Sequence, residues 1–144
     1  MKKNGFTLIE LLASIVVLGI IALIVFPTVD KTIKNQKNKL YKRQLDTIVD
    51  ASKAWGTKNT GLLPNDEDHK LYVGLNVIVS SGNLENDDIE DPRKDQKITG
   101  CTIIKYNPSY RQYEYEFIDL NEEPDNNCNP NSKCVLDTTT GLCE

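Results

Sequence analysis

Glu10 is the one carboxylate in an otherwise apolar segment near the start of the chain, residues 6–26. A carboxylate costs about 2.5–3.5 kcal/mol at the centre of a membrane-spanning helix, and somewhat less near an end, so its presence calls for a partner. No basic residue lies within the segment, and the partner must therefore come from outside it. The alternative is that Glu10 stays hydrated at the membrane edge, because it lies only about 6 Å along the helix axis from residue 6.

The four cysteines, Cys101, Cys128, Cys134 and Cys143, all lie after residue 100. An even number of cysteines in an exported domain indicates two disulfides, with three possible connectivities. We expect Cys101 to pair with Cys128, which ties the tail to a predicted hairpin, and Cys134 to pair with Cys143. Each closed loop contributes about 2–4 kcal/mol, which matters in a tail with few apolar residues. Zinc is disfavoured because the sequence has no Cys-x-x-Cys pair.

A calcium site is the more specific alternative to solvated turns in the tail, because residues 122–131 are rich in Asp and Asn. Calcium binds six to eight oxygen ligands from carboxylates and carbonyls. The segment lacks the spaced Asp-x-Asp-x-Asp pattern of a calcium loop. We therefore expect solvated turns there, with no metal and no cofactor.

Catalytic residue patterns are missing from the sequence. His69 is the only histidine, and we expect it to lie exposed in a polar linker. No glycine-rich phosphate loop, metal triad or serine nucleophile elbow is present. The neighbouring acids Asp87, Asp88, Glu90 and Asp91 are better explained as a solvated face than as a catalytic pair. We expect a protein that is not an enzyme.

The apolar segment is long enough to cross a membrane. As a helix its 21 residues span about 31 Å, close to the roughly 30 Å of a bilayer core. Lys2 and Lys3 precede it, which favours an N-terminus in the cytoplasm and a chain outside the membrane beyond residue 27. No Ala-x-Ala pattern follows Phe26, so we expect the segment to remain in the mature protein. An uncleaved single-span anchor is one explanation of this pattern.

Charge divides the chain into two parts. Residues 1–60 hold ten Lys/Arg and four Asp/Glu, which gives a net charge of +6. Residues 61–144 hold seven Lys/Arg and seventeen Asp/Glu, which gives a net charge of −10. The acidic distal part argues against a nucleic-acid-binding surface, because phosphate contacts need clustered Lys and Arg. Residues 28–144 are enough to bury one modest core.

A long helix is predicted to continue beyond the apolar segment. Pro27 would kink or loosen it at the membrane exit. Apolar residues then recur at helical spacing among basic side chains, and the helix should end near Gly56, a favourable C-terminal cap. A helix from about 6 to 55 would be roughly 75 Å long. The stripe expected to dock on a globular head consists of Ile33, Leu40, Tyr41, Leu45, Ile48, Ser52 and Trp55.

Shorter elements are predicted in the rest of the chain. Residues 57–70 are dense in turn formers and predict a loop, followed by a short strand at 71–73. Residues 75–81 fit a strand or a helix, and we favour a helix capped by Gly82. Residues 101–106 and 110–118 predict an antiparallel hairpin.

The second strand of this hairpin has one buried face. Tyr113, Tyr115 and Phe117 alternate with Glu114 and Glu116. An aromatic set at period two on a half-buried sheet is typical of core rather than of a ligand platform. Its expected packing partner is the helical stripe that ends at residue 55.

The residues Gly5-Phe6-Thr7-Leu8-Ile9-Glu10, between a short basic leader and an unbroken apolar helix, resemble the prepilin signal of type IV pilins and pseudopilins, as in low-GC Gram-positive bacteria. The resemblance implies that a prepilin peptidase cuts between Gly5 and Phe6 and methylates the amino group of Phe6. It also implies that Glu10 pairs with the amino terminus of Phe6 in a neighbouring subunit and sets the axial register. Pro27 falls where many pilins also have a proline.

The resemblance implies an α+β pilin fold, in which a long N-terminal helix, half of it in the membrane, packs on a small antiparallel sheet with a disulfide-stapled C-terminal region. The implied organisation is a leader at 1–5, a transmembrane and filament-core helix at 6–27, an amphipathic helical half at 28–56, a connecting αβ-loop at 57–100, a β-hairpin at 101–120 and a cysteine-containing C-terminal region at 121–144.

The implied function is structural: a type IV pilus subunit that polymerises through its N-terminal helix after leader cleavage. Implied partners are other pilin subunits in a helical homo-oligomer, the membrane, the prepilin peptidase, the assembly platform and the extension ATPase, with no nucleic acid bound directly. The subunit would be a single-pass cell-membrane protein before assembly and part of an extracellular pilus afterwards. The alternatives are a pseudopilin of a type II secretion-like or competence system, and an uncleaved membrane-anchored extracellular binding domain.

Overall fold

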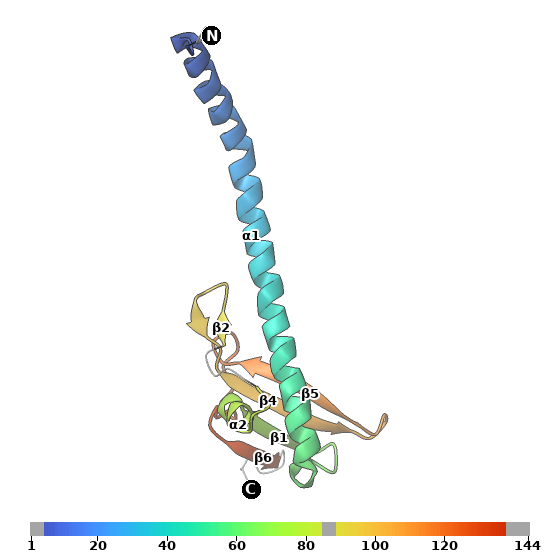
Figure 1. Ribbon diagram of the computed structural model, residues 1–144. Helices are drawn as coiled ribbons and strands as arrows, with labels where there is room; N and C mark the ends of the chain where they lie inside the picture. Colours follow the sequence, from blue (N-terminus) through green and yellow to red (C-terminus); the bar gives the residue numbers. More distant parts are fainter. Residues whose placement is uncertain (1–4, 85–88, 138–144) are drawn as a thin grey trace. The chain divides into compact units, whose positions relative to one another are not determined.

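The computed structural model describes residues 5–84 and 89–137 (Figure 1). The chain separates into two compact units, Met1–Lys39 and Leu40–Glu144. Helix α1, Leu8–Lys58, begins in the first unit and ends in the second. The second unit also contains all the strands, so the expected α+β class is confirmed.

Helix α1 contains Pro27 and continues past Gly56, where the sequence analysis placed its end. The expected kink at Pro27 stays a prediction. The assignment of Gly56 as a C-terminal cap is wrong, because Gly56 is a buried residue within the helix, and a Cβ there would collide with the hydroxyl of Tyr115. Gly56 thus allows α1 to approach the sheet closely. Asn59 caps the helix instead, donating its side-chain amide to the carbonyl of Trp55 at 2.9 Å.

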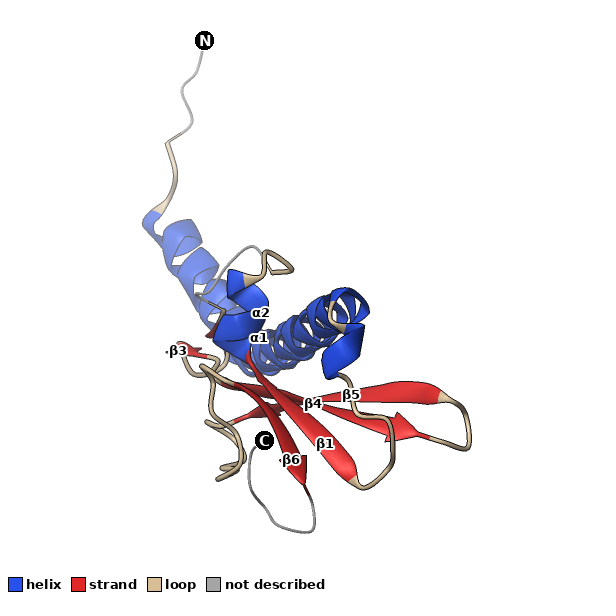
Figure 2. Ribbon diagram, turned by 90° about the horizontal axis from the view of Figure 1, so that it is seen from below, coloured by secondary structure: helices blue, strands red, loops and turns tan. Residues whose placement is uncertain are grey.

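The main sheet has four antiparallel strands in the order β5 (Gln112–Asp119), β4 (Gly100–Asn107), β1 (His69–Gly74) and β6 (Lys133–Asp137) (Figure 2). The predicted hairpin is confirmed as β4, Gly100–Asn107, and β5, Gln112–Asp119. The predicted short strand is part of β1, His69–Gly74, and the favoured helix is α2, Leu75–Ser80.

Four short elements were not predicted. Strand β6, Lys133–Asp137, pairs with β1 inside the cysteine-containing C-terminal region, for which no strand was predicted. Strands β2, Glu90–Asp91, and β3, Gln96–Lys97, form a separate hairpin, and Thr60–Leu62 form a 3-10 turn in the expected loop.

The C-terminal part of α1 covers one face of the main sheet, and the core lies between them (Figure 2). Trp55 is 1% exposed and packs with Leu71 and Ile104, and the rings of Tyr113 and Tyr115 lie against this cluster. The predicted contact between the aromatic strand and the helical stripe is therefore confirmed. Within the stripe, Ser52 forms a buried 2.6 Å hydrogen bond with the hydroxyl of Thr102.

The predicted stripe is too long at its N-terminal end. Ile33 and Leu40 are 47% and 49% exposed, whereas Tyr41 and Ile48 are buried. Helical spacing identifies a common face, but it does not show how far along the helix the packing extends.

The C-terminal segment approaches the sheet at Gly74, at the junction of β1 and α2. The N–H of Gly74 donates to the carbonyl of Ser132 at 2.8 Å, and the N–H of Asn76 donates to that of Pro130 at 3.1 Å. A Cβ at Gly74 would collide with the backbone carbonyl of Pro130. Glycine is therefore required here for a close approach between two backbone segments.

We predict that Gly74→Ala lowers the free energy of unfolding by about 2 kcal/mol, because overpacking forces backbone shifts. The measurement is urea unfolding of the full chain in detergent micelles, followed by the fluorescence of Trp55, the sole tryptophan. Gly61→Ala is the matched control, since a Cβ at Gly61 meets nothing within 4 Å. Equal stability of the two variants would contradict the close-approach explanation.

Candidate functional site at the N-terminal helix

The N-terminal end of α1 places the residues singled out for processing and pairing on the surface. Gly5 and Phe6 precede the helix, and Phe6 is 80% exposed. A Cβ at Gly5 would meet no atom within 4 Å. Packing within the described chain therefore gives no reason for a glycine at this position.

Thr7 caps the helix and contacts Glu10, a contact that the sequence analysis missed. The Thr7 hydroxyl accepts a hydrogen bond from the Glu10 N–H at 3.4 Å and lies 3.4 Å from Glu10 Oε2, to which it donates. A Thr followed three residues later by a Glu is the signature of a capping box, and this pattern could have revealed the cap. Glu10 is exposed, so its carboxylate remains accessible to another molecule.

The helix that follows exposes an apolar surface on all sides. It is long and apolar enough to cross a membrane, with a mean hydropathy of 2.9 over its most apolar 18 residues, none of them buried. A helix that is hydrophobic all round belongs in a core or in a membrane. The exposed large side chains between residues 6 and 26 are Phe6, Leu8, Ile9, Leu11, Leu12, Ile15, Val16, Val17, Leu18, Ile20, Ile21, Leu23, Ile24, Val25 and Phe26.

In the second unit, Arg93 joins the β2–β3 hairpin to α1 and to the loop after β5. Its guanidinium donates to both carboxylate oxygens of Asp91, at 2.9 and 2.7 Å, and also contacts Glu122. The same group lies 3.4 Å above the ring of Tyr41, whose hydroxyl donates to Asp119 at 2.9 Å. Three segments distant in sequence are thus held by one cation.

Burial and charge shift the proton affinities of this cluster. The hydrogen bond from Arg93 holds the pKa of Asp91 below its usual value, against a smaller opposing effect of burial. Burial, followed by the hydrogen bond to Asp119, raises the pKa of Tyr41. Asp91 is only 3% exposed, so its assignment to a solvated acidic face is wrong; the arginine two residues later compensates its burial. Glu90 is exposed, and Asp87 and Asp88 lie outside the described residues.

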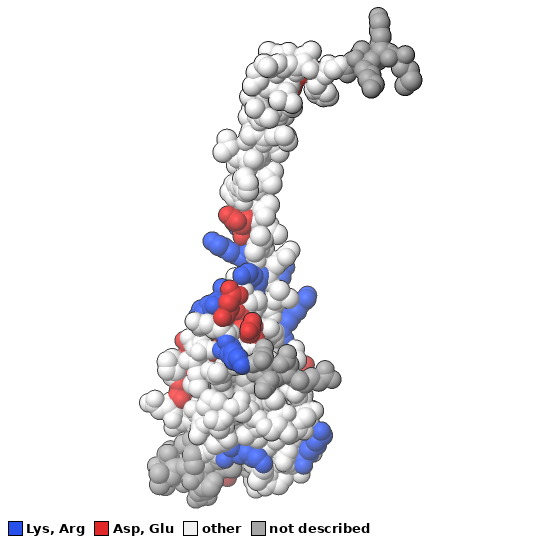
Figure 3. Space-filling model, turned by 60° about the vertical axis from the view of Figure 1, so that its left-hand side comes forward, with Lys and Arg blue, Asp and Glu red and all other residues white. Residues whose placement is uncertain are grey.

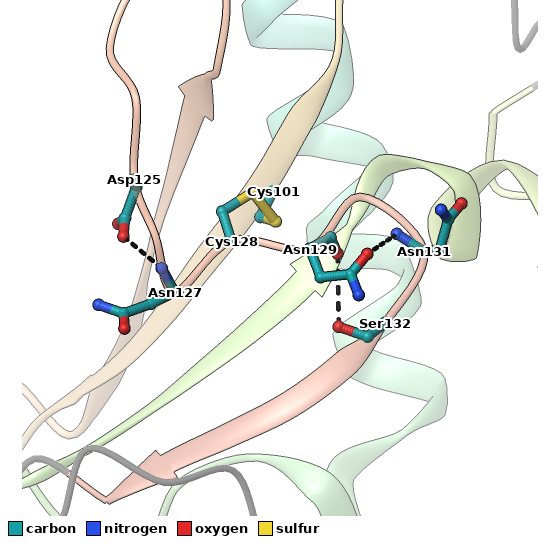
Figure 4. Close-up of a disulfide and its surroundings, with 7 residues drawn as sticks. All are labelled: Cys101, Asp125, Asn127, Cys128, Asn129, Asn131 and Ser132. Atoms are coloured by element: carbon teal, nitrogen blue, oxygen red, sulfur yellow. Dashed lines mark hydrogen bonds between the residues drawn. A yellow bond between two sulfur atoms is a disulfide. The ribbon is translucent and has the colours of Figure 1, made fainter.

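The disulfide between Cys101 and Cys128 ties β4 to the loop before β6, the pairing favoured from the sequence (Figure 4). Both cysteines pack with Tyr72 and Ile103, which alternate along the strands with Leu71 and Ile104, the residues that pack against Trp55 of α1. Cys134 is also disulfide-bonded, and Cys143, its expected partner, lies outside the described residues.

The Asp- and Asn-rich tail forms local turns. Asp125 accepts the N–H of Asn127 at 2.8 Å, and Asn129 accepts that of Asn131 at 3.0 Å (Figure 4). Among the described residues, no group of three or more His, Cys, Asp or Glu is placed to hold a metal ion.

His69 occupies a different position from the one expected. It is the first residue of β1 rather than part of a linker, and its Nδ1 lies 2.5 Å from a carboxylate oxygen of Asp66. That hydrogen bond is the main cause of a lowered Asp66 pKa.

We predict that Arg93→Met lowers the free energy of unfolding at pH 7 by about 3 kcal/mol, because it leaves the buried Asp91 charge uncompensated. A carboxyl group with a lowered folded-state pKa stabilises the fold above its unfolded pKa of about 4, and this stability is lost as the pH falls through the folded value. The difference between wild type and Arg93→Met should therefore narrow below about pH 4, as urea unfolding at each pH would show.

Lys53→Met is the control, because it removes an exposed ion pair with Asp50 that is worth under about 1 kcal/mol. A loss equal to that of the control at pH 7 would contradict the assigned role of Arg93.

Comparison with known proteins identifies the N-terminal segment. The family model for the prokaryotic N-terminal methylation motif matches residues 1–26. No curated protein and no solved structure matches the chain. The match covers Gly5, Phe6 and Glu10, and ends at the last residue of the apolar segment. The chain thus carries, on a pilin-like α+β fold, the class III prepilin signal of type IV pilins and pseudopilins.

Proposed function

We propose that this chain is a structural subunit of a type IV pilus, cleaved between Gly5 and Phe6 and polymerised through its N-terminal helix. The observation that carries the proposal is the coincidence of the methylation motif with a helix whose apolar side chains are exposed all round. Before assembly the lipid bilayer covers these side chains. In the filament, the equivalent helices of other subunits cover them.

Cleavage supplies the partner that Glu10 requires. A new amino terminus on Phe6 is mostly cationic at neutral pH and carries a methyl group after modification. The Glu10 carboxylate of a neighbouring subunit accepts it, and a charge pair surrounded by apolar side chains gains strength from the low dielectric. Because only one axial offset brings the two groups together, the pair sets the register between subunits. Glu10 is free for this role because its contact with Thr7 is long and exposed.

The remaining segments follow from this assignment. Residues 1–5 form the leader that the prepilin peptidase removes, and residues 6–27 form the filament core, with Pro27 bending the helix at the membrane exit. The assembly platform and the extension ATPase drive the subunit from the cell membrane, N-terminus inside, into an extracellular pilus. Residues 28–144, with their disulfides, form the surface of the filament.

A pseudopilin of a secretion or competence system is the second candidate, because the methylation motif serves both classes. The disulfide-tied tail favours the pilin, since a surface filament exposes its subunits to an environment in which covalent cross-links are maintained. Electron microscopy of sheared material separates the two: long, abundant filaments support a pilin, and short, sparse ones support a pseudopilin.

We predict that Glu10→Gln lowers the amount of subunit in sheared filaments by at least about tenfold, because loss of the pair costs more than about 1.4 kcal/mol. The subunit should accumulate in the membrane fraction, as immunoblots of both fractions would show. Thr7→Val is the matched control. It removes the hydroxyl that caps the helix and contacts Glu10, but leaves the carboxylate in place, and it should assemble. Assembly lost with Thr7→Val and retained with Glu10→Gln would contradict the pairing and leave only a capping role.

A further inference from the structure

A run of six cations, here called the basic segment, occupies residues 31–43 of α1. It contains no acidic residue. Five of the cations are exposed and Lys37 is half-buried, and no described residue forms an ion pair with any of them. Figure 3 shows Lys and Arg along the helix beyond its uncharged part, with Asp and Glu side chains among them. The cations are Lys31, Lys34, Lys37, Lys39, Lys42 and Arg43.

The basic segment is unfavourable for the isolated helix. Lys31, Lys34 and Lys37 follow one another at a spacing of three residues, and Lys39 lies three and four residues before Lys42 and Arg43. Like charges at these spacings lie side by side on a helix and destabilise it by about 0.2–0.5 kcal/mol per pair. Asp30 and Asp46 flank the segment and offset the repulsion only at Lys34, Lys42 and Arg43. An external anionic surface would remove this repulsion.

The globular unit of the same chain carries such a surface. Residues 90–95 and 119–125, here called the acidic loops, hold seven carboxylates and two cations. Asp91 and Asp119 are buried, and the other five carboxylates are at least partly exposed. They are joined through Arg93 and Glu122. Glu90, Asp95 and Glu123 are exposed, and none of the three side chains has a hydrogen-bond or ion-pair partner among the described residues.

We propose that the basic segment of one copy of the chain binds the acidic loops of a second copy. This inference rests on the proposed function and adds to it the lateral contact between subunits outside the membrane. A subunit that carries two different, complementary surfaces forms a heterologous contact, and such a contact generates an open helical filament when its rotation does not close a ring.

Anionic lipid is the other possible partner for a basic segment, but it fits the spacing less well. Along the helix axis, Lys31 lies about 7.5 Å beyond Phe26 and Arg43 about 25 Å beyond it. The headgroup layer on each side of a bilayer is only about 5–7 Å thick. Lipid would therefore neutralise the start of the basic segment and leave most of it unpaired.

The test is a charge swap in the full chain, expressed in the bacterium that makes it. Lys34→Glu with Lys39→Glu should lower sheared filament yield at least about tenfold, and Glu90→Lys with Glu123→Lys should do the same, since like-charge contacts across an interface cost several kcal/mol. Combining all four substitutions should restore most of the yield. Co-expressing the two double variants should also restore it, because the acidic loops already contact Tyr41 of their own chain and only a contact between copies can be rescued in this way. The control is Lys53→Glu with Arg111→Glu, which reverses two charges outside the basic segment and should assemble as wild type does.

Wild-type filaments should also dissociate more readily in about 1 M salt than in about 0.1 M, because the screening length falls from about 10 to about 3 Å. Filaments that form equally well in all four variants would overturn the inference and leave the proposed function intact. Wild-type chain that never leaves the membrane would contradict the proposed function itself.

Failure of the swap to rescue assembly would also overturn the inference. The chain would then be reconstituted at low density in vesicles, and the chemical labelling of its lysines would be measured. Weaker labelling in phosphatidylglycerol vesicles than in phosphatidylcholine vesicles would assign the basic segment to lipid.

Discussion

The rest of the molecule depends on one constraint: an apolar helix whose side chains find no cover within the described part of the chain. Fully burying a Leu, Ile, Val or Phe side chain is worth about 1.5–3 kcal/mol. Burying all the exposed apolar side chains of this segment would therefore contribute tens of kcal/mol. A structure with that much uncovered apolar surface is stable only in a bilayer or against other copies. In the proposed filament, Glu10 and the amino terminus that cleavage would create make the choice between these environments specific, because a bilayer offers neither group a partner.

The same helix also builds the globular unit. The helix is apolar all round as far as Phe26 and then carries the basic segment. Beyond residue 40 it has a single buried face, on which Trp55 is the centre of the core against β1 and β4. Two glycines allow backbone to approach closely, Gly56 beneath Tyr115 and Gly74 beneath the C-terminal segment. The disulfide on the opposite face and the Arg93 cluster then hold loops that have few apolar residues of their own. The fold is thus closed by cross-links where hydrophobic burial is insufficient.

Elements with a strong local pattern could be predicted from the sequence. The helix, the β4–β5 hairpin and the contact of its aromatic face with the helical stripe follow from periodicity, and the prepilin signal follows from the residues around Gly5. Elements whose partners are distant could not. Strand β6 is five residues long, and it pairs with β1, whose residues lie 60 or more positions earlier in the chain. Asp91 was grouped with the neighbouring acidic residues as solvated, because nothing in the sequence shows that the side chain of Arg93 contacts it. Gly56 was assigned to a helix cap because the contact that requires a glycine there is with Tyr115, 59 positions later in the sequence.

The most direct test of the central claim is the intact mass and N-terminal peptide of the protein from its native bacterium, measured under non-reducing conditions. The account predicts a chain that begins at N-methylated Phe6 and lacks four hydrogens relative to the reduced form, as two disulfides among the four cysteines require. A chain that still begins at Met1 or Lys2 would contradict it, since an uncleaved leader leaves no amino terminus on Phe6 for Glu10 to bind and reduces the helix to a membrane anchor.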